Sequence, residues 1–248
     1  MEEIFLFSIF GFLASLIDGC IGMAYGVFLT SVLTASGIPL LTASAGIHFS
    51  EIFTTFISGI SHLSFKNIDF NLLKKIAITG ALGGIIGALT LANIDNVSLK
   101  PFVAVYLFLL GVKIIYKSLK NQQKEKSTTH LKKIGFIGGF FDAVGGGGWG
   151  PIVTGTLISK GHTPAKTIGT VNLAEFFVTL AQSIIFFTVI NLTSFNLVIG
   201  LILGAAIASP IAVIITKKVN STKLMRYVGS TIILINLFVL INIVKDLL

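Results

Sequence analysis

Residues 142–150 read DAVGGGGWG and residues 18–26 read DGCIGMAYG, and these two stretches decide how the chain folds. Each places an acid and a cluster of glycines inside a long apolar segment. Each glycine inside a helix costs about 1 kcal/mol relative to alanine, and Pro151 directly follows the second cluster. The sequence therefore predicts a break in the helix at both places.

The surrounding chain has the composition of a membrane protein. Of its 248 residues, 54% are hydrophobic and 11% are charged, and the mean hydropathy is +0.94. A soluble domain carries about 25% charged residues, so a soluble enzyme is excluded. At about 20 apolar residues per crossing, the chain has room for about eight membrane segments. These apolar segments cover residues 4–36, 40–64, 73–93, 100–119, 134–160, 167–190, 196–216 and 226–244.

The chain is a tandem repeat. At a constant offset of 124 residues, the two halves align without gaps and pair acids and glycines that an apolar composition would not match by chance. The predicted units are a first half (1–120), a cytoplasmic linker (121–130) and a second half (131–248). Internal repeats are common in secondary transporters, whose substrate site lies between the repeats. The identical pairs include Asp18/Asp142, Glu51/Glu175, Gly11/Gly135, Gly22/Gly146, Gly26/Gly150 and Gly37/Gly161.

The positions of the basic residues predict the topology. The lysine-rich linker is expected on the cytoplasmic side. If both glycine-rich segments enter the membrane and return as re-entrant hairpins, Lys100 and Lys245 are the only basic residues left outside. Each half then has one broken hairpin and three full crossings, and this odd number inverts the second half. The predicted fold is an all-α polytopic membrane protein built from two inverted repeats.

The same placement of charge bears on partners. The formal net charge is +8, but the basic residues separate apolar runs and therefore act as topology signals, so no nucleic-acid partner is expected. The single cysteine, Cys20, excludes an intrachain disulfide and a cysteine-based metal cage. The sequence leaves the oligomeric state open.

The two breaks are predicted to meet near the bilayer midplane. Helix amino termini carry about half a positive charge and offer free N–H groups, which suits a small anion. The alternative role of such glycines is close helix packing, which is favoured for Gly80/Gly84, Gly83/Gly87 and Gly200/Gly204. The candidate substrate-binding residues are Gly19, Gly22, Tyr25, Gly26, Gly145, Gly146, Gly147, Gly148, Trp149 and Asn172.

Acids inside a membrane need a polar environment, because each costs about 2.5–3.5 kcal/mol at a helix centre. Glu51 and Glu175 lie on polar helix faces and are candidates for proton exchange during transport. The predicted proton-coupling and pathway residues are His48, Glu51, Thr55, Glu175 and Thr179. For the threonines, hydrogen bonding between helices is the alternative.

Asp18 and Asp142 precede the two breaks and are expected to cap the helical segments that follow. His48 and Glu51 spell HxxE, but zinc sites usually need three protein ligands, so neither a metal nor another cofactor is expected. The sequence contains neither GxSxG nor GxxxxGK[ST], and the chain is predicted not to be an enzyme.

The glycine-rich motif at 142–175, its weaker copy at 18–51 and the two four-segment halves resemble the TauE/SafE (TSUP) family of membrane permeases. The resemblance implies a plasma-membrane transporter, often an exporter, for sulfite, organosulfonates, thiosulfate or related anions. The first copy departs from the pattern, with Ile21, Met23 and Ala24 in place of glycines and Val27 in place of Pro151. The predicted function is a secondary transporter of such an anion by alternating access, with proton coupling. The alternative is an anion channel.

Overall fold

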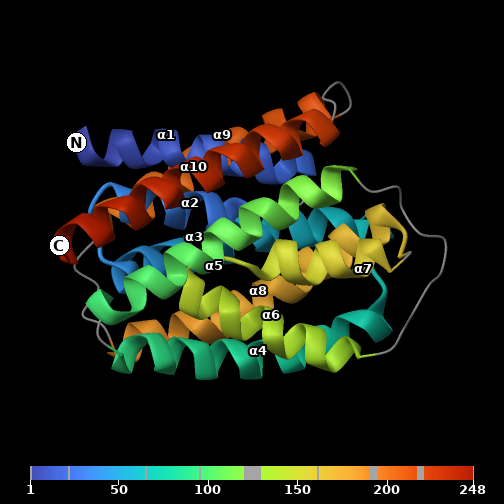
Figure 1. Cartoon of the computed structure of the whole chain (residues 1–248). Coiled ribbons are helices and arrows are strands. Elements are labelled where there is room, and N and C mark those ends of the chain that lie inside the picture. The colour runs from blue at the N-terminus through green and yellow to red at the C-terminus, as the bar shows by residue number, and fades with distance from the viewer. Residues whose placement is uncertain are drawn as a thin grey trace.

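The computed structural model describes residues 2–21, 23–64, 66–94, 96–119, 130–160, 162–189, 195–216 and 221–247, and their regular structure is entirely helical. Most of the predicted linker lies outside these residues. The helices lie side by side in one bundle (Figure 1). In chain order they are α1 (Glu2–Ile21), α2 (Tyr25–Ala35), α3 (Leu40–Ser64), α4 (Phe70–Asn93), α5 (Asn96–Leu119), α6 (Leu131–Gly145), the π-helical turn η1 (Gly150–Thr154), α7 (Gly155–Ser159), α8 (Pro164–Val189), α9 (Phe195–Thr216) and α10 (Ser221–Leu247).

Several helices have the length and the apolar surface that a lipid bilayer requires. Within the part of the chain that the structure describes, five apolar stretches are long enough to cross it: Leu40–Ser64, Phe70–Asn93, Leu99–Leu119, Lys166–Val189 and Met225–Lys245. Large apolar side chains point outward from them, including Phe102 and Phe187. Exposed apolar side chains on helices of this length fit contact with lipid. The chain is therefore a multi-pass membrane protein.

The tandem repeat is visible in the helix boundaries. α1 ends at Ile21 and α6 ends at Gly145, at the repeat offset of 124 residues. Helical structure resumes at Tyr25 in the first half and at Trp149 in the second, again at that offset. The later helices correspond as α3 with α8, α4 with α9 and α5 with α10.

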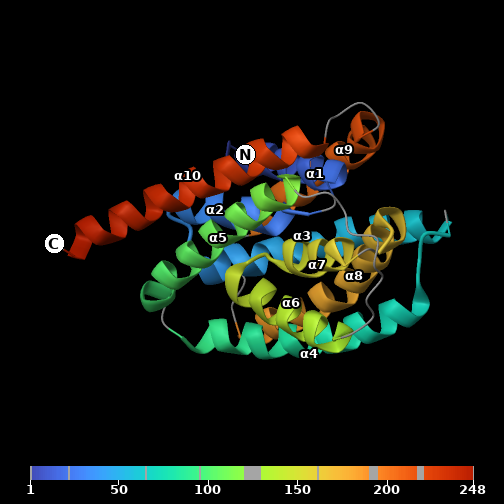
Figure 2. The same ribbon diagram turned by 45° about the vertical axis from the view of Figure 1, so that its right-hand side comes forward.

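The two sequence halves interlock. α1 packs along α9 of the other half, and α6 packs along α4 in the equivalent way. α3 contacts α9, and its counterpart α8 contacts α4. Two helices also pack against their own counterparts in the other half, α3 against α8 and α5 against α10. Figure 2 shows α4 beside α6 and α5 beside α10 in a second view. The main helix pairs are thus preserved when the halves are exchanged, and neither half is a separate core.

Glycines allow the closest of these contacts, as predicted for the spaced pairs. A Cβ at Gly83 of α4 would lie 2.9 Å from the carbonyl carbon of Phe136 in α6. A Cβ at Gly204 of α9 would lie 2.6 Å from the amide nitrogen of Phe12 in α1. The backbones of both helix pairs therefore touch, as small residues permit in membrane helices.

The first break lies later than the sequence suggests. The stretch predicted to break begins at Asp18, but α1 continues for 20 residues to Ile21, which corresponds to about 30 Å. The first copy has Cys20 and Ile21 where the second has Val144 and Gly145, and the isolated Gly19 costs only about 1 kcal/mol within a helix. The first break is therefore confined to the few residues between Ile21 and Tyr25.

Replacing Gly83 by valine is expected to lower the unfolding temperature of the detergent-purified protein. The added side chain would force α4 away from α6, and overpacking of this kind costs about 1–3 kcal/mol. Leu82→Val is the matched control, because Leu82 lies on the outward face of the same helix. Equal unfolding temperatures for the two variants would contradict the close packing of α4 on α6.

Candidate functional site

The two breaks meet inside the bundle. A Cβ at Gly26, in the first turn of α2, would lie 2.7 Å from Gly147 Cα and 2.9 Å from Gly146 O. A Cβ at Gly150 would lie 2.9 Å from Met23 Cα. The Thr30 hydroxyl also donates a hydrogen bond to the carbonyl of Gly146. The structure thus brings the two glycine-rich stretches into backbone contact.

The backbone at each break leaves the helical region. Gly146 ends α6 with a φ of 62°, and Ala24 precedes α2 with a φ of 100°. A left-handed conformation costs a residue with a Cβ about 1–2 kcal/mol, so Ala24 holds strain at a position where the second copy has Gly148.

Several peptide N–H groups at this junction are left without partners. The amides of Val27, Gly148 and Gly150 form no hydrogen bond with the residues that the structure describes. Free amides at the start of a helical segment, together with the positive end of its dipole, favour a negatively charged ligand. The junction therefore offers donors to an anion.

Each aspartate holds the start of the segment that follows its break. Asp142 Oδ1 accepts a hydrogen bond of 2.9 Å from the Trp149 amide. Asp18 Oδ1 accepts one of 3.4 Å from the Tyr25 amide, at the equivalent position. Each bond reaches an amide seven residues further along the chain, so it ties the end of one helix to the start of the next segment. The expected capping of these segments stays a prediction.

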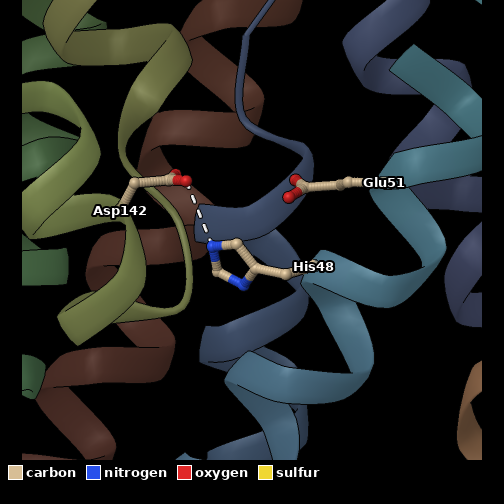
Figure 3. Close-up of side chains that lie close together, drawn as sticks. All are labelled: His48, Glu51 and Asp142. Atoms are coloured by element: carbon tan, nitrogen blue, oxygen red, sulfur yellow. Dashed lines mark hydrogen bonds and ion pairs between the residues drawn. The ribbon is translucent and has the colours of Figure 1, made fainter. Parts of the chain in front are cut away.

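The second carboxylate oxygen of Asp142 joins the two halves. It lies 3.1 Å from His48 Nε2 on α3 and 3.1 Å from Gln182 Nε2 on α8 (Figure 3 shows the contact with His48). His48, Asp142 and Gln182 are all buried. Ser44 adds a further link, since its hydroxyl donates to the Ala143 carbonyl at 2.8 Å.

The hydrogen bonds define which atoms carry protons. His48 Nδ1 lies 2.6 Å from the Ser44 carbonyl, which can only accept, so Nδ1 carries a hydrogen. The Gln182 nitrogen also lies 3.2 Å from the Gly139 carbonyl, which fixes the orientation of the amide. When His48 is an imidazolium and Asp142 a carboxylate, the pair is neutral. Asp142 then adds no net negative charge beside the junction.

Glu51 completes the cluster from the next turn of α3. It is 3% exposed, and its Oε2 has no hydrogen-bond partner among the described residues. Figure 3 shows its carboxylate pointing toward His48 and Asp142. A buried polar atom without a partner costs about 1–3 kcal/mol, so this oxygen marks a place for a proton or a ligand.

The structure adds a third potential metal ligand to His48 and Glu51, which the sequence did not show. Asp142 brings its carboxylate to these two residues, and the three potential ligand atoms lie within 4.8 Å of one another. His48 and Gln182 both bond to the same Asp142 oxygen, so a cation there would have to displace two hydrogen bonds. The cluster is best described as a hydrogen-bonded network.

The other substrate-binding candidates from the sequence make contacts of different kinds. The Tyr25 hydroxyl lies 3.0 Å from Ser50 Oγ, and the buried Trp149 donates through Nε1 to the Val171 carbonyl at 3.2 Å. Both rings pack into hydrophobic clusters. Gly145 lies against the Tyr106 ring, Gly19 lies in the last turn of α1, and Gly22 is outside the described residues.

The predicted pathway residues differ in their surroundings. The hydroxyls of Thr55 and Thr179 donate to the carbonyls of Glu51 and Glu175 within their own helices, so these bonds do not join helices. The amide of Asn172 donates to Ser58 Oγ at 2.8 Å, which links α8 to α3. Glu175 is partly buried.

Sequence reasoning missed three residues of the site. Gln182 belongs to the polar face that includes Glu175 and Thr179, so its spacing carried a signal. Ser44 lies one turn before His48 on the same face. Tyr106 donates to the Gly147 carbonyl at 3.3 Å, but it is the single polar side chain within residues 101–112 and gave no periodic signal.

The apolar helices and the enclosed polar junction define a multi-pass membrane protein, and its relatives are membrane transporters. Residues 7–239 match the model of the family described as sulfite exporter TauE/SafE, so the chain belongs to this family. The chain is 37% identical over 252 residues to a Bacillus subtilis (strain 168) protein described as "probable membrane transporter protein YtnM", with 98% of this chain and 84% of that relative covered. No solved structure matches the chain significantly.

The backbone contact between the breaks predicts opposite effects for two small substitutions. Gly26→Ala is expected to lower the unfolding temperature, because the methyl group would displace the Gly147 backbone, at a cost of about 1–3 kcal/mol. Ala24→Gly is expected to leave it unchanged or raise it, because glycine relieves the left-handed strain. Destabilisation by Ala24→Gly with none by Gly26→Ala would contradict the geometry of the junction.

Proposed function

We propose that the protein is a secondary transporter that exports a small sulfur-containing anion, such as sulfite, an organosulfonate or thiosulfate, across the plasma membrane. The observation that carries the proposal is the junction of the two breaks, which lies beside a buried polar cluster and includes peptide amides without partners among the described residues. The family description, sulfite exporter, supports the choice of anion. Sulfite presents charged oxygens that such N–H donors can bind.

We also propose that the two halves have opposite orientations in the membrane, with the linker in the cytoplasm. In Figure 1 both termini lie at the left end of the bundle, and the end of α5 and the start of α6 lie at the right end. This placement supports an odd number of crossings in each half. Lys100, near the start of α5, and Lys245, near the end of α10, then lie on the outer side, in agreement with the positive-inside rule.

The packing suggests which parts move in alternating access. One hydrophobic cluster joins α1, α2, α3 and α9, and an equivalent cluster joins α4, α6, η1, α7 and α8. The breaks lie between these two groups of helices. A rocking motion of one group against the other would expose the junction first to one side of the membrane and then to the other.

The position of Glu51 supports the proposal of proton coupling. A Cβ at Gly26 would lie 3.4 Å from Glu51 Oε1, so this carboxylate lies beside the junction. An anion arriving there would be repelled by an ionised Glu51, and protonation of Glu51 removes the repulsion. Glu175 holds the equivalent position in the second half and is the second proton-exchanging group of the proposal.

Counterflow in liposomes tests the transporter against the channel. Liposomes that contain the purified protein and are preloaded with unlabelled sulfite are expected to accumulate labelled sulfite transiently, with a rate that saturates. A channel gives a rate that does not saturate and no accumulation. That result, or the absence of any sulfite flux, would contradict the proposal for this substrate.

The pH change that accompanies sulfite flux tests the proton-coupling residues. Glu51→Gln and Glu175→Gln are expected to reduce sulfite-driven proton movement at least about tenfold, the effect of about 1.4 kcal/mol on a rate. Glu2→Gln is the control, because Glu2 is exposed at the start of α1. Unchanged proton movement in the two site variants would remove both glutamates from the coupling mechanism.

A further inference from the structure

We propose that His48 and Asp142 share a proton that passes to Glu51 when the anion arrives, and that this transfer releases the link between α3 and the second break. The inference rests on the proposed anion transport and adds a specific route for the proton. It is carried by the hydrogen bonds of His48, by the position of Asp142 at the break and by the unpartnered oxygen of Glu51.

The hydrogen bonds require one proton between His48 and Asp142. Because His48 Nδ1 donates to the Ser44 carbonyl, the proton that changes place must be the one on Nε2. The 3.1 Å contact between Nε2 and Asp142 Oδ2 is a hydrogen bond only when one of the two atoms carries that proton. The carboxylate form of Asp142 also accepts from Gln182 and Trp149, and these donors stabilise the imidazolium–carboxylate arrangement.

Glu51 is the destination of the proton. It lies three residues beyond His48 on α3, is buried, and has an oxygen without a partner. The potential ligand atoms of the three groups lie within 4.8 Å of one another, so a side-chain rotation of Glu51 is needed to reach hydrogen-bond distance. In the transfer the Nε2–H bond breaks and an O–H bond forms on Glu51. The imidazolium becomes a neutral imidazole and the carboxylate a neutral acid, so this step leaves the total charge unchanged. His48 then takes up a proton from water, and this uptake is the source of the pH change.

The proton transfer changes the hydrogen bonds of Asp142. Before it, Asp142 bonds to His48 on α3 through Oδ2 and to the Trp149 amide through Oδ1. After it, His48 no longer donates, and the bond between α3 and the second break is lost. An anion beside Glu51 favours the neutral form of that residue. After the transfer the negative charge rests on Asp142, whose carboxylate still accepts from Gln182 and from the Trp149 amide.

The proposed proton transfer concerns the second break and has no counterpart at the first. The equivalent of His48 is Asn172, which has no titratable proton and whose amide donates to Ser58. The neighbouring elements also contribute titratable groups that interact electrostatically with Glu51 or Asp142. These are Asp18 on α1, Tyr25 on α2, Tyr106 on α5 and Glu175 on α8.

Nitrogen-15 NMR of the full-length protein labelled in histidine tests the proton positions without any anion. His48→Asn, which copies Asn172, assigns the His48 signals. In the wild type Nδ1 is expected to carry hydrogen, and Glu51→Gln, which removes the proton acceptor, is expected to change the Nε2 signal. Loss of hydrogen from Nδ1, or identical Nε2 signals in the wild type and Glu51→Gln, would overturn the inference.

Transport assays separate this inference from the proposed function. In His48→Asn the sulfite-driven pH change per sulfite transported is expected to fall at least about tenfold. Ser44→Ala is the matched control, because it removes another hydrogen bond between α3 and α6 but keeps the carbonyl that bonds to His48. Equal pH changes in the two variants would overturn the shared proton. Absence of sulfite counterflow in the wild type would overturn the proposed function instead.

Discussion

A peptide group that leaves a helix inside a bilayer needs another partner, and this constraint shapes the centre of the protein. The structure meets it with side chains from other elements. Thr30 of the first half donates to Gly146, Tyr106 donates to Gly147, and Asp142 accepts from the amide that opens the following segment. The amides that these side chains do not satisfy are the ones that a bound anion would complete.

Because the halves interlock, helices of both repeats pack around this junction. Close packing of α1 on α9 and of α4 on α6 depends on glycines whose Cβ atoms would strike the neighbouring backbone. Each break therefore rests on a helix from the other half. His48 and Asp142 add a polar bond across the same boundary, and their second-half and first-half counterparts, Asn172 and Asp18, leave the two breaks chemically different.

Much of this arrangement could be predicted from the sequence, because apolar runs, glycine clusters and a 124-residue repeat are local or periodic signals. The helix boundaries and the breaks follow from them. The end of α1 did not, because a single Gly19 leaves the choice between break and helix nearly balanced. The bonds of Asp142 to His48 and Gln182 join residues about 40 or more positions apart, and no local pattern reports such contacts.

The central claim is that an anion binds where the two breaks touch. Its most direct test is an experimental structure of the protein soaked with selenite, the selenium analogue of sulfite, with the ion located by anomalous scattering. The account predicts one peak within hydrogen-bond distance of the amides of Val27 and Gly148. A peak confined to the aqueous surface, or none while sulfite is still transported, would contradict it.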